Sequence, residues 1–196
     1  MSVEENLSWW RDHHEPQRYL DVPPGRTDAL VELIRGLDLG GGAILEIGCN
    51  AGRNLAGLWA AGYRRLHGIE ISPAALRVFR NTYPECLEVK LSLGAVEEII
   101  RLTAADSFGL VFTMATLLHL HPESEWVFAE MVRITSRWLL TVECENRNQR
   151  SKAGIQRHWA RNYRTIFEGL GMRQTHEQAG FGDLDRYIAR IFKKPA

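Results

Sequence analysis

The sequence has few cysteines, no net charge and no long apolar run. Its 196 residues include three cysteines, Cys49, Cys86 and Cys144, and none of them has the spacing of a zinc site or a redox pair. Lysine plus arginine equals aspartate plus glutamate at 24 each, so no overall charge favours nucleic acid or an anionic membrane. We therefore expect no metal site and a reducing, cytoplasmic setting.

No apolar stretch reaches the length of a membrane span, and the charged, aromatic N-terminus lacks the apolar core of a signal peptide. Internal repeats and low-complexity tracts are also missing. The composition, with 45% hydrophobic and 24% charged residues, is that of a globular protein. The length suits one domain with a small appendage. We expect a monomer or homodimer that does not act on a membrane.

From residue 43 onward, short apolar runs alternate with longer amphipathic ones. The runs predict strands at residues 43–47, 66–71, 87–91, 108–113 and 138–142. The amphipathic segments predict helices at residues 54–61, 73–83, 95–102 and 123–134, and a long final helix carrying Ile155, Trp159, Ile166 and Leu170. Alternating strands and helices favour a doubly wound α/β fold with a mostly parallel sheet.

The two ends of the chain depart from this alternation. Residues 172–177 and 186–192 read as strands joined by a turn-rich segment, which predicts an antiparallel C-terminal hairpin and a seven-stranded sheet. Residues 1–42 read as a helical N-terminal extension beside a domain spanning 43–196. Its polar-tipped aromatic side chains suggest a substrate lid, although they could equally pack as core; the substrate contacts expected there are Trp10, His14 and Tyr19.

A glycine-containing loop follows the first predicted strand. Residues 48–52 read G-x-N-x-G, and ligands of open parallel sheets bind beyond the carboxyl ends of such strands. Asn50 is a residue type that tolerates the left-handed conformation. Glu70 ends the second predicted strand, where an acid can accept hydrogen bonds from both hydroxyls of a ribose. Loop and acid together indicate an adenosine-containing ligand, either a dinucleotide or S-adenosylmethionine.

Three segments resemble motifs of the class I S-adenosylmethionine-dependent methyltransferases of the small-molecule type. They are ILEIGCNAGRN, GIEISPAAL and FGLVFTMATLLHLHPE, and the resemblance spans residues 43–192. Arg53 stands where a nicotinamide-binding loop would more often have its third glycine. The resemblance implies S-adenosylmethionine as cofactor, held by Glu46, Gly48, Cys49, Asn50, Gly52, Glu70, Ile71, Ala95, Val96 and Thr113.

The resemblance also assigns roles within this set. Glu46 and Thr113 would lie near the methionine moiety, Glu70 would hold the ribose, and Ile71 would pack on the adenine. The chain departs from the family pattern at two places. Residues 92–96 contain no acid to bind the adenine amino group, so backbone groups of Ala95 and Val96 would serve; and Gly109 replaces the aspartate common in the fourth-strand motif.

Methyl transfer needs orientation of the reactants, and a general base where the acceptor must lose a proton. His119 and His121 follow the fourth predicted strand and are candidate bases, the alternative being that they pack or cap beside Pro122. Glu143 ends the fifth predicted strand and is a third catalytic candidate, the alternative being a solvated strand end. The basic segment 146–167 contains no acid and could bind an anionic group through Arg147, His158 and Arg161.

We therefore predict methyl transfer from S-adenosylmethionine to an oxygen or nitrogen of a small molecule that carries an anionic group. The alternatives are an RNA methyltransferase that grips phosphates with the basic segment, a protein methyltransferase, and a non-catalytic cofactor-binding module. A nucleic-acid substrate is less favoured because the net charge is zero and residues 113–116 lack the Asn/Asp-Pro-Pro-aromatic motif of amino-directed enzymes.

Overall fold

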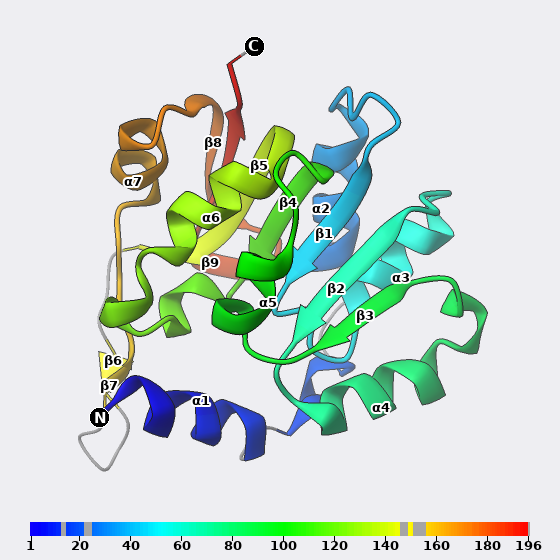
Figure 1. Ribbon diagram of the computed structural model, residues 1–196. Coiled ribbons are helices and arrows are strands. Elements are labelled where there is room, and N and C mark those ends of the chain that lie inside the picture. The colour runs from blue at the N-terminus through cyan, green and yellow to red at the C-terminus, as the bar shows by residue number, and fades with distance from the viewer. Residues whose placement is uncertain (13–14, 22–24, 146–148, 151–155, 196) are drawn as a thin grey trace.

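The computed structural model describes residues 1–12, 15–21, 25–145, 149–150 and 156–195. Its centre is a seven-stranded sheet in the order β3-β2-β1-β4-β5-β9-β8 (Figure 1). The parallel strands are β1 (Ala43–Ile47), β2 (Leu66–Glu70), β3 (Lys90–Leu93), β4 (Phe108–Met114) and β5 (Thr135–Cys144). β8 (Arg173–Phe181) and β9 (Leu184–Lys193) form an antiparallel hairpin against β5. The predicted fold class is confirmed.

Helices cover both faces of the sheet, which buries β1 and β4 along their whole length. α2 (Gly25–Arg35), α3 (Arg53–Ala60) and α4 (Pro73–Thr82) contribute to the core on one face. α5 (Val96–Leu102), α6 (Val127–Ile134) and α7 (Tyr163–Gly169) contribute to the core on the other. None of the helices in the described ranges has the length and apolar character needed to cross a membrane.

The remaining elements lie mainly around the ends of the strands. α1 (Val3–Asp12) runs across the end of the sheet toward which β1, β2 and β3 point (Figure 1). Four short 3-10 helices are η1 (Pro16–Tyr19), η2 (Pro84–Cys86), η3 (Leu117–His119) and η4 (Pro122–Ser124). A small separate hairpin pairs β6 (Gln149–Arg150) with β7 (Gln156–His158).

Local chemistry explains why α4 begins where the sequence predicts. The Ser72 hydroxyl accepts a hydrogen bond from the Ala75 amide at 3.4 Å, and Pro73 occupies the first helical turn. Phe79, fully buried, anchors the helix to the core beneath the glycine loop. The glycine loop and α4 are therefore packed directly against each other.

The third strand lies three residues later than predicted. Residues 84–89 instead form η2 and a turn, and Leu87 is 75% exposed. Arg80 stabilises this turn by donating to the carbonyl oxygens of Cys86 and Val89 at 3.0 and 2.8 Å. The prediction of a strand at residues 87–91 was wrong because a side chain, rather than a neighbouring strand, satisfies these carbonyls.

The predicted long final helix was also wrong. α7 contains only residues Tyr163–Gly169, and Asn162 caps it by accepting a hydrogen bond from the Thr165 amide at 3.0 Å. Residues 156–158 are extended as β7, and the Trp159 amide donates to the Leu118 carbonyl at 2.7 Å. Ile155 lies outside the described residues. A tertiary hydrogen bond to η3 thus takes the place of a helical one.

Candidate functional site

The described residues form a cavity at the carboxyl ends of β1, β2 and β4, here called the cofactor cavity. Strand order reverses between β1 and β4, so the cavity lies at the switch point of the sheet. Its floor comes from the loop after β1 and from the ends of β2 and β4. Residues of α1 and η3 form the opposite wall, and they include Asn6, Leu7, Trp10, His119 and Leu120.

The loop after β1 is closely packed. The amides of Gly48 and Cys49 both donate to the Ile69 carbonyl, at 2.8 and 3.1 Å. Gly52 has φ +74°, and a Cβ placed on it would lie 2.0 Å from the Phe79 ring. Asn50 also adopts a left-handed conformation, with φ +50°. The sequence predicted cofactor contacts for Gly48, Cys49, Asn50 and Gly52, and all four line the cavity.

Glu70 connects this loop to the start of α4. Its carboxylate accepts hydrogen bonds from the amides of Asn50 and Ser72, both at 2.8 Å. A carboxylate has about four acceptor positions, so these two bonds are compatible with further bonds from ribose hydroxyls. Glu70 and Ile71 line the cavity, as do Ala95 and Val96.

Glu46 presents a buried acceptor atom to the cavity. One carboxylate oxygen accepts from the Asn54 amide nitrogen at 2.7 Å, and Asn54 in turn accepts from the Thr27 hydroxyl at 3.0 Å. The other oxygen, Oε2, is buried and has no hydrogen-bond partner among the described residues. Burial raises the pKa of Glu46 to about 8. A cationic group in the cavity would satisfy Oε2 and stabilise the ionised form.

Arg53, the first residue of α3, presents the complementary charge. Its Nε and Nη1 atoms are buried without a hydrogen-bond partner in the described part of the chain, and its side chain lines the same cavity. Burial, followed by the charge of Arg26, lowers the pKa of Arg53. An acceptor on Glu46 and donors on Arg53 fit the ammonium and carboxylate groups of an amino acid, which is the methionine end of S-adenosylmethionine.

Thr113 and Gly109 of β4 lie behind the site. Thr113 is fully buried and does not line the cofactor cavity, whereas the next residue, Met114, does. A Cβ on Gly109 would lie 2.7 Å from the Leu39 carbonyl oxygen and 3.1 Å from the Gly42 Cα. The aspartate common at this position in the family has no space here, because two backbones approach each other closely.

His119 is the catalytic candidate that reaches the cavity. Its ring lies against Trp10 at 4.0 Å and against His158 at 4.5 Å between centroids. Its Nδ1 lies 3.2 Å from the Arg157 carbonyl oxygen. A carbonyl only accepts hydrogen bonds, so this contact favours the neutral tautomer with the proton on Nδ1 and the lone pair on Nε2. This tautomer is the one that a base acting through Nε2 requires.

The other two catalytic candidates lie outside the cofactor cavity. His121 is buried and caps η4, with Nδ1 accepting from the Glu123 amide at 3.3 Å and Nε2 lying 3.2 Å from the Met1 carbonyl oxygen. Glu143 is fully buried, and its carboxylate accepts bonds from backbone amides of η3. Burial raises the pKa of Glu143 to about 7.

The expected substrate contacts divide into three groups. Trp10 and Tyr19 line the cavity. His158 contacts the His119 ring, whereas Arg161 points into the protein, donating to the Leu117 and Leu120 carbonyls and to Glu125. His14 and Arg147 lie outside the described residues.

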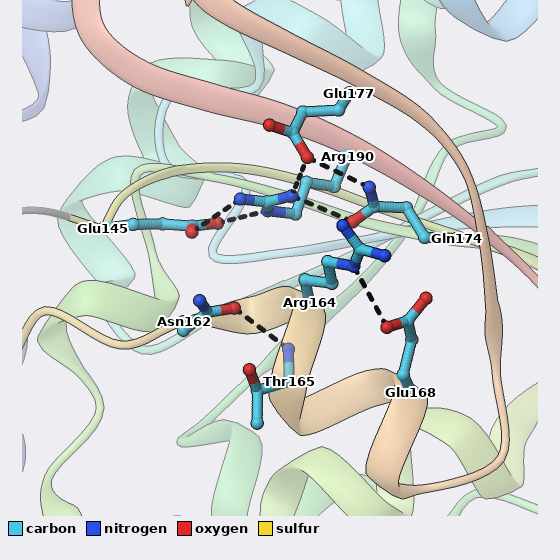
Figure 2. A network of polar contacts seen from close by, with 8 residues as sticks. All are labelled: Glu145, Asn162, Arg164, Thr165, Glu168, Gln174, Glu177 and Arg190. Atoms are coloured by element: carbon cyan, nitrogen blue, oxygen red, sulfur yellow. Dashed lines mark hydrogen bonds and ion pairs between the residues drawn. The ribbon is translucent and has the colours of Figure 1, made fainter.

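Two arginines of the basic segment have counterions outside the range 146–167. Arg161 pairs with Glu125 on the loop before α6, and Arg164 pairs with Glu168 within α7. Figure 2 shows the neighbouring cluster in which Arg190 of β9 holds Glu145 at the end of β5, with the Arg164–Glu168 pair beside it. The lack of acids between residues 146 and 167 therefore does not leave these two arginines available to an anionic substrate.

Comparison with known proteins decides the family. Residues 44–137 match the sequence model of a methyltransferase domain. The chain contains a methyltransferase domain of the class I S-adenosylmethionine-dependent type. The family assignment and the cofactor expected from the sequence are confirmed, and the chain is an enzyme of this class. No curated protein sequence matches it.

Several solved methyltransferase structures share the fold. A Burkholderia thailandensis 1,6-didemethyltoxoflavin-N1-methyltransferase with bound 1,6-didemethyltoxoflavin and S-adenosylhomocysteine has 14% identity and a TM-score of 0.73 over 99% of this chain and 87% of that one. A Synechocystis magnesium protoporphyrin IX methyltransferase with bound S-adenosylmethionine has 19% identity and a TM-score of 0.63 over 86% and 78%. A Mesorhizobium loti S-adenosylmethionine-dependent methyltransferase has 12% identity and a TM-score of 0.65 over 86% and 98%.

Sequence reasoning missed part of the methyltransferase cavity. The missed lining residues that carry polar side chains include Asn6, Arg26, Arg53, Asn54 and Thr116. Arg53 and Asn54 directly follow the glycine loop and could have been found there, because the first turn of the next helix faces the ligand. Arg26 reaches the site from α2, where it pairs with Asp183 of the β8–β9 turn, and no local pattern marks that contact.

Proposed function

We propose that this methyltransferase methylates an oxygen or nitrogen atom of a small molecule and that His119 is the general base. The observation that carries the proposal is the hydrogen bond of His119 Nδ1 to the Arg157 carbonyl, which puts the lone pair on Nε2 in a ring that lines the cavity. The cofactor supplies the methyl group as an electrophilic sulfonium. His119 Nε2 would take the proton from the O–H or N–H of the acceptor as the new bond forms.

We further propose that the N-terminal extension, residues 1–42, covers the acceptor side of the cavity. Asn6 is buried and donates to the His119 carbonyl at 3.0 Å, and Leu7 and Trp10 line the cavity beside it. Trp9 extends this contact, since the Arg157 guanidinium lies 4.3 Å from its ring centre. Such a cover would exclude water from the reacting atoms.

The size of the acceptor is inferred from this enclosure. A cavity walled on one side by α1 and η3 suits a small molecule better than a duplex, and the Burkholderia methyltransferase named above has 1,6-didemethyltoxoflavin bound. We assign no anionic group to the acceptor, because Arg161, which was expected to bind it, is bonded inside the protein. We place the enzyme in the cytoplasm, since its three cysteines are buried and none forms a disulfide.

Two measurements test the proposal in order. Calorimetry should show that S-adenosylmethionine and S-adenosylhomocysteine bind the wild type and that Glu70→Gln weakens both. Labelled S-adenosylmethionine should then transfer its methyl group to a component of a metabolite extract. His119→Gln should retain S-adenosylhomocysteine binding and lose about 100-fold in turnover, whereas His176→Gln on β8 should behave as wild type.

Each failure has a distinct meaning. Labelling of RNA with a steep dependence of binding on salt would favour the RNA alternative, and labelling of protein would favour a protein substrate. Cofactor binding without transfer to any of these pools would favour a non-catalytic module. Full activity in His119→Gln would overturn the assignment of the base alone.

A further inference from the structure

The short turn that carries His119 is held at its beginning by a buried carboxylate. Glu143 of β5 accepts hydrogen bonds from three successive amides: Thr116 and Leu117 at 3.0 Å to Oε1, and Leu118 at 3.3 Å to Oε2. The Glu143 side chain is completely buried and does not line the cofactor cavity. These amides begin η3, so they are donors that no intrahelical carbonyl can satisfy.

The end of the same turn is held by a buried guanidinium. Arg161 donates through Nη1 to the Leu117 carbonyl at 3.1 Å and through Nη2 to the Leu120 carbonyl at 2.8 Å. Its Nε donates to Glu125 at 2.8 Å, so the fork is fixed at its outer side too. The Arg161 side chain is 7% exposed, which leaves it little freedom to move.

The backbone of β7 completes the enclosure of η3. The Arg157 carbonyl lies at His119 Nδ1, and the Trp159 amide donates to the Leu118 carbonyl at 2.7 Å. Arg161 follows Trp159 by two residues. The bonds from Arg161 and from this backbone segment therefore hold η3 close to the Arg157 carbonyl, which orients the His119 ring. A shift of η3 relative to β7 would change the distance between His119 Nδ1 and its carbonyl.

We propose that Glu143 and Arg161 are positioning residues that fix the place and the tautomer of His119. The inference rests on His119 acting as the base in the proposed function. Glu143 satisfies the amides at the beginning of the turn, and Arg161 satisfies the carbonyls at its end. Neither side chain lines the cavity, so both act through η3, and Glu143 is not itself a base toward the acceptor.

Histidine NMR on the full chain tests this directly, without an acceptor. Long-range proton–nitrogen spectra of the ¹⁵N-labelled protein separate the two neutral tautomers, and loss of signals in His119→Gln assigns them. We expect wild type to show the Nδ1–H form of His119. Glu143→Gln and Arg161→Lys should each give a mixture of tautomers while still binding S-adenosylhomocysteine. Arg164→Lys, a neighbouring exposed arginine on α7, is the matched control and should leave the His119 signals unchanged.

A purely structural role would lower stability without changing the tautomer. An unchanged Nδ1–H pattern in folded Glu143→Gln and Arg161→Lys would therefore overturn the proposal. If Glu143→Gln does not fold, the tautomer of His119 in Arg161→Lys and in Glu125→Gln decides the question. Glu125→Gln removes the charge of the half-exposed outer partner of Arg161.

Activity then separates this inference from the proposed function. Once an acceptor is known, both variants should lower kcat by about 100-fold, with KM for the cofactor little changed, because displacement of the base affects the chemical step. Wild-type protein with the expected tautomer but no methyl transfer would contradict the proposed function and leave the positioning role intact.

Discussion

Glu46 is the residue on which the charge balance of the cofactor site depends. Its pKa is raised to about 8 by burial, and Oε2 has no partner in the described part of the protein. Near pH 7 the cofactor-free carboxyl is therefore mostly protonated. The ammonium group of S-adenosylmethionine would stabilise the ionised form and lower this pKa.

We predict that cofactor binding near pH 7 releases up to about one proton from Glu46. Calorimetry in two buffers with different ionisation enthalpies measures this number. Glu46→Gln should abolish the dependence on buffer and weaken binding, whereas Glu97→Gln, another acid in the cavity lining, should leave the dependence unchanged. Buffer-independent heats in the wild type would show that Glu46 does not titrate with the cofactor.

Among the elements, β5, β8 and β9 are joined by backbone pairing and also by the side chain of one buried arginine. Arg190 donates to both carboxylate oxygens of Glu145, at 2.7 and 2.9 Å, and both side chains are 6% exposed (Figure 2). Gln174 and Glu177 of β8 accept further bonds from the same guanidinium. Glu145, the residue directly after β5, is thereby tied to the hairpin.

Arg190→Gln should lower the free energy of unfolding by about 3 kcal/mol, because Glu145 would remain buried without its partner. Arg164→Gln breaks the exposed pair with Glu168 in the same region and should cost less than about 1 kcal/mol. Urea denaturation measures both. The double variant Arg190→Gln/Glu145→Gln should recover part of the stability lost in Arg190→Gln. Equal losses of unfolding free energy in Arg190→Gln and Arg164→Gln would contradict this account of the joint.

At the scale of the whole molecule, two buried carboxyls control how stability depends on pH. Glu46 and Glu143 titrate near 8 and 7 in the folded chain, against 4.5 for an ordinary glutamate. Between these values the folded protein keeps protons that the unfolded chain has lost. Their stabilising contribution is therefore full below about pH 4.5 and is lost as pH rises through 7 to 8.

The cofactor-free enzyme should thus become less stable between about pH 5.5 and about pH 8.5, by at most about 1.4 kcal/mol per pH unit for each carboxyl. His67 and His158 act in the opposite direction, because burial lowers the pKa of each, but both are only half-buried. The unfolding free energy, measured with urea across this pH range, should fall less steeply with pH for Glu46→Gln than for wild type. A wild-type stability that rises steadily with pH would be inconsistent with both shifts.

The sequence by itself determined the elements whose pattern is local. The apolar run 43–47, the glycines of the loop and the Ser72–Pro73 cap each act through their own backbone, so strand, loop and helix could be predicted from neighbouring residues. Glu70 was also predictable, since it ends the second strand beside that loop. These features indicated the family and the cofactor, and they predict the edge of the sheet at which it binds.

Only the tertiary structure decided how the charged residues are used. The sequence suggests a catalytic role for Glu143 and a substrate contact for Arg161. In the structure Glu143 binds amides 25–27 residues away, and Arg161 binds carbonyls 41–44 residues away. The sequence alone does not indicate such partners, because a buried charge takes whichever donors or acceptors the fold brings to it. The same reason explains why Arg53 and Glu46 face one cavity and why His119, rather than His121, reaches it.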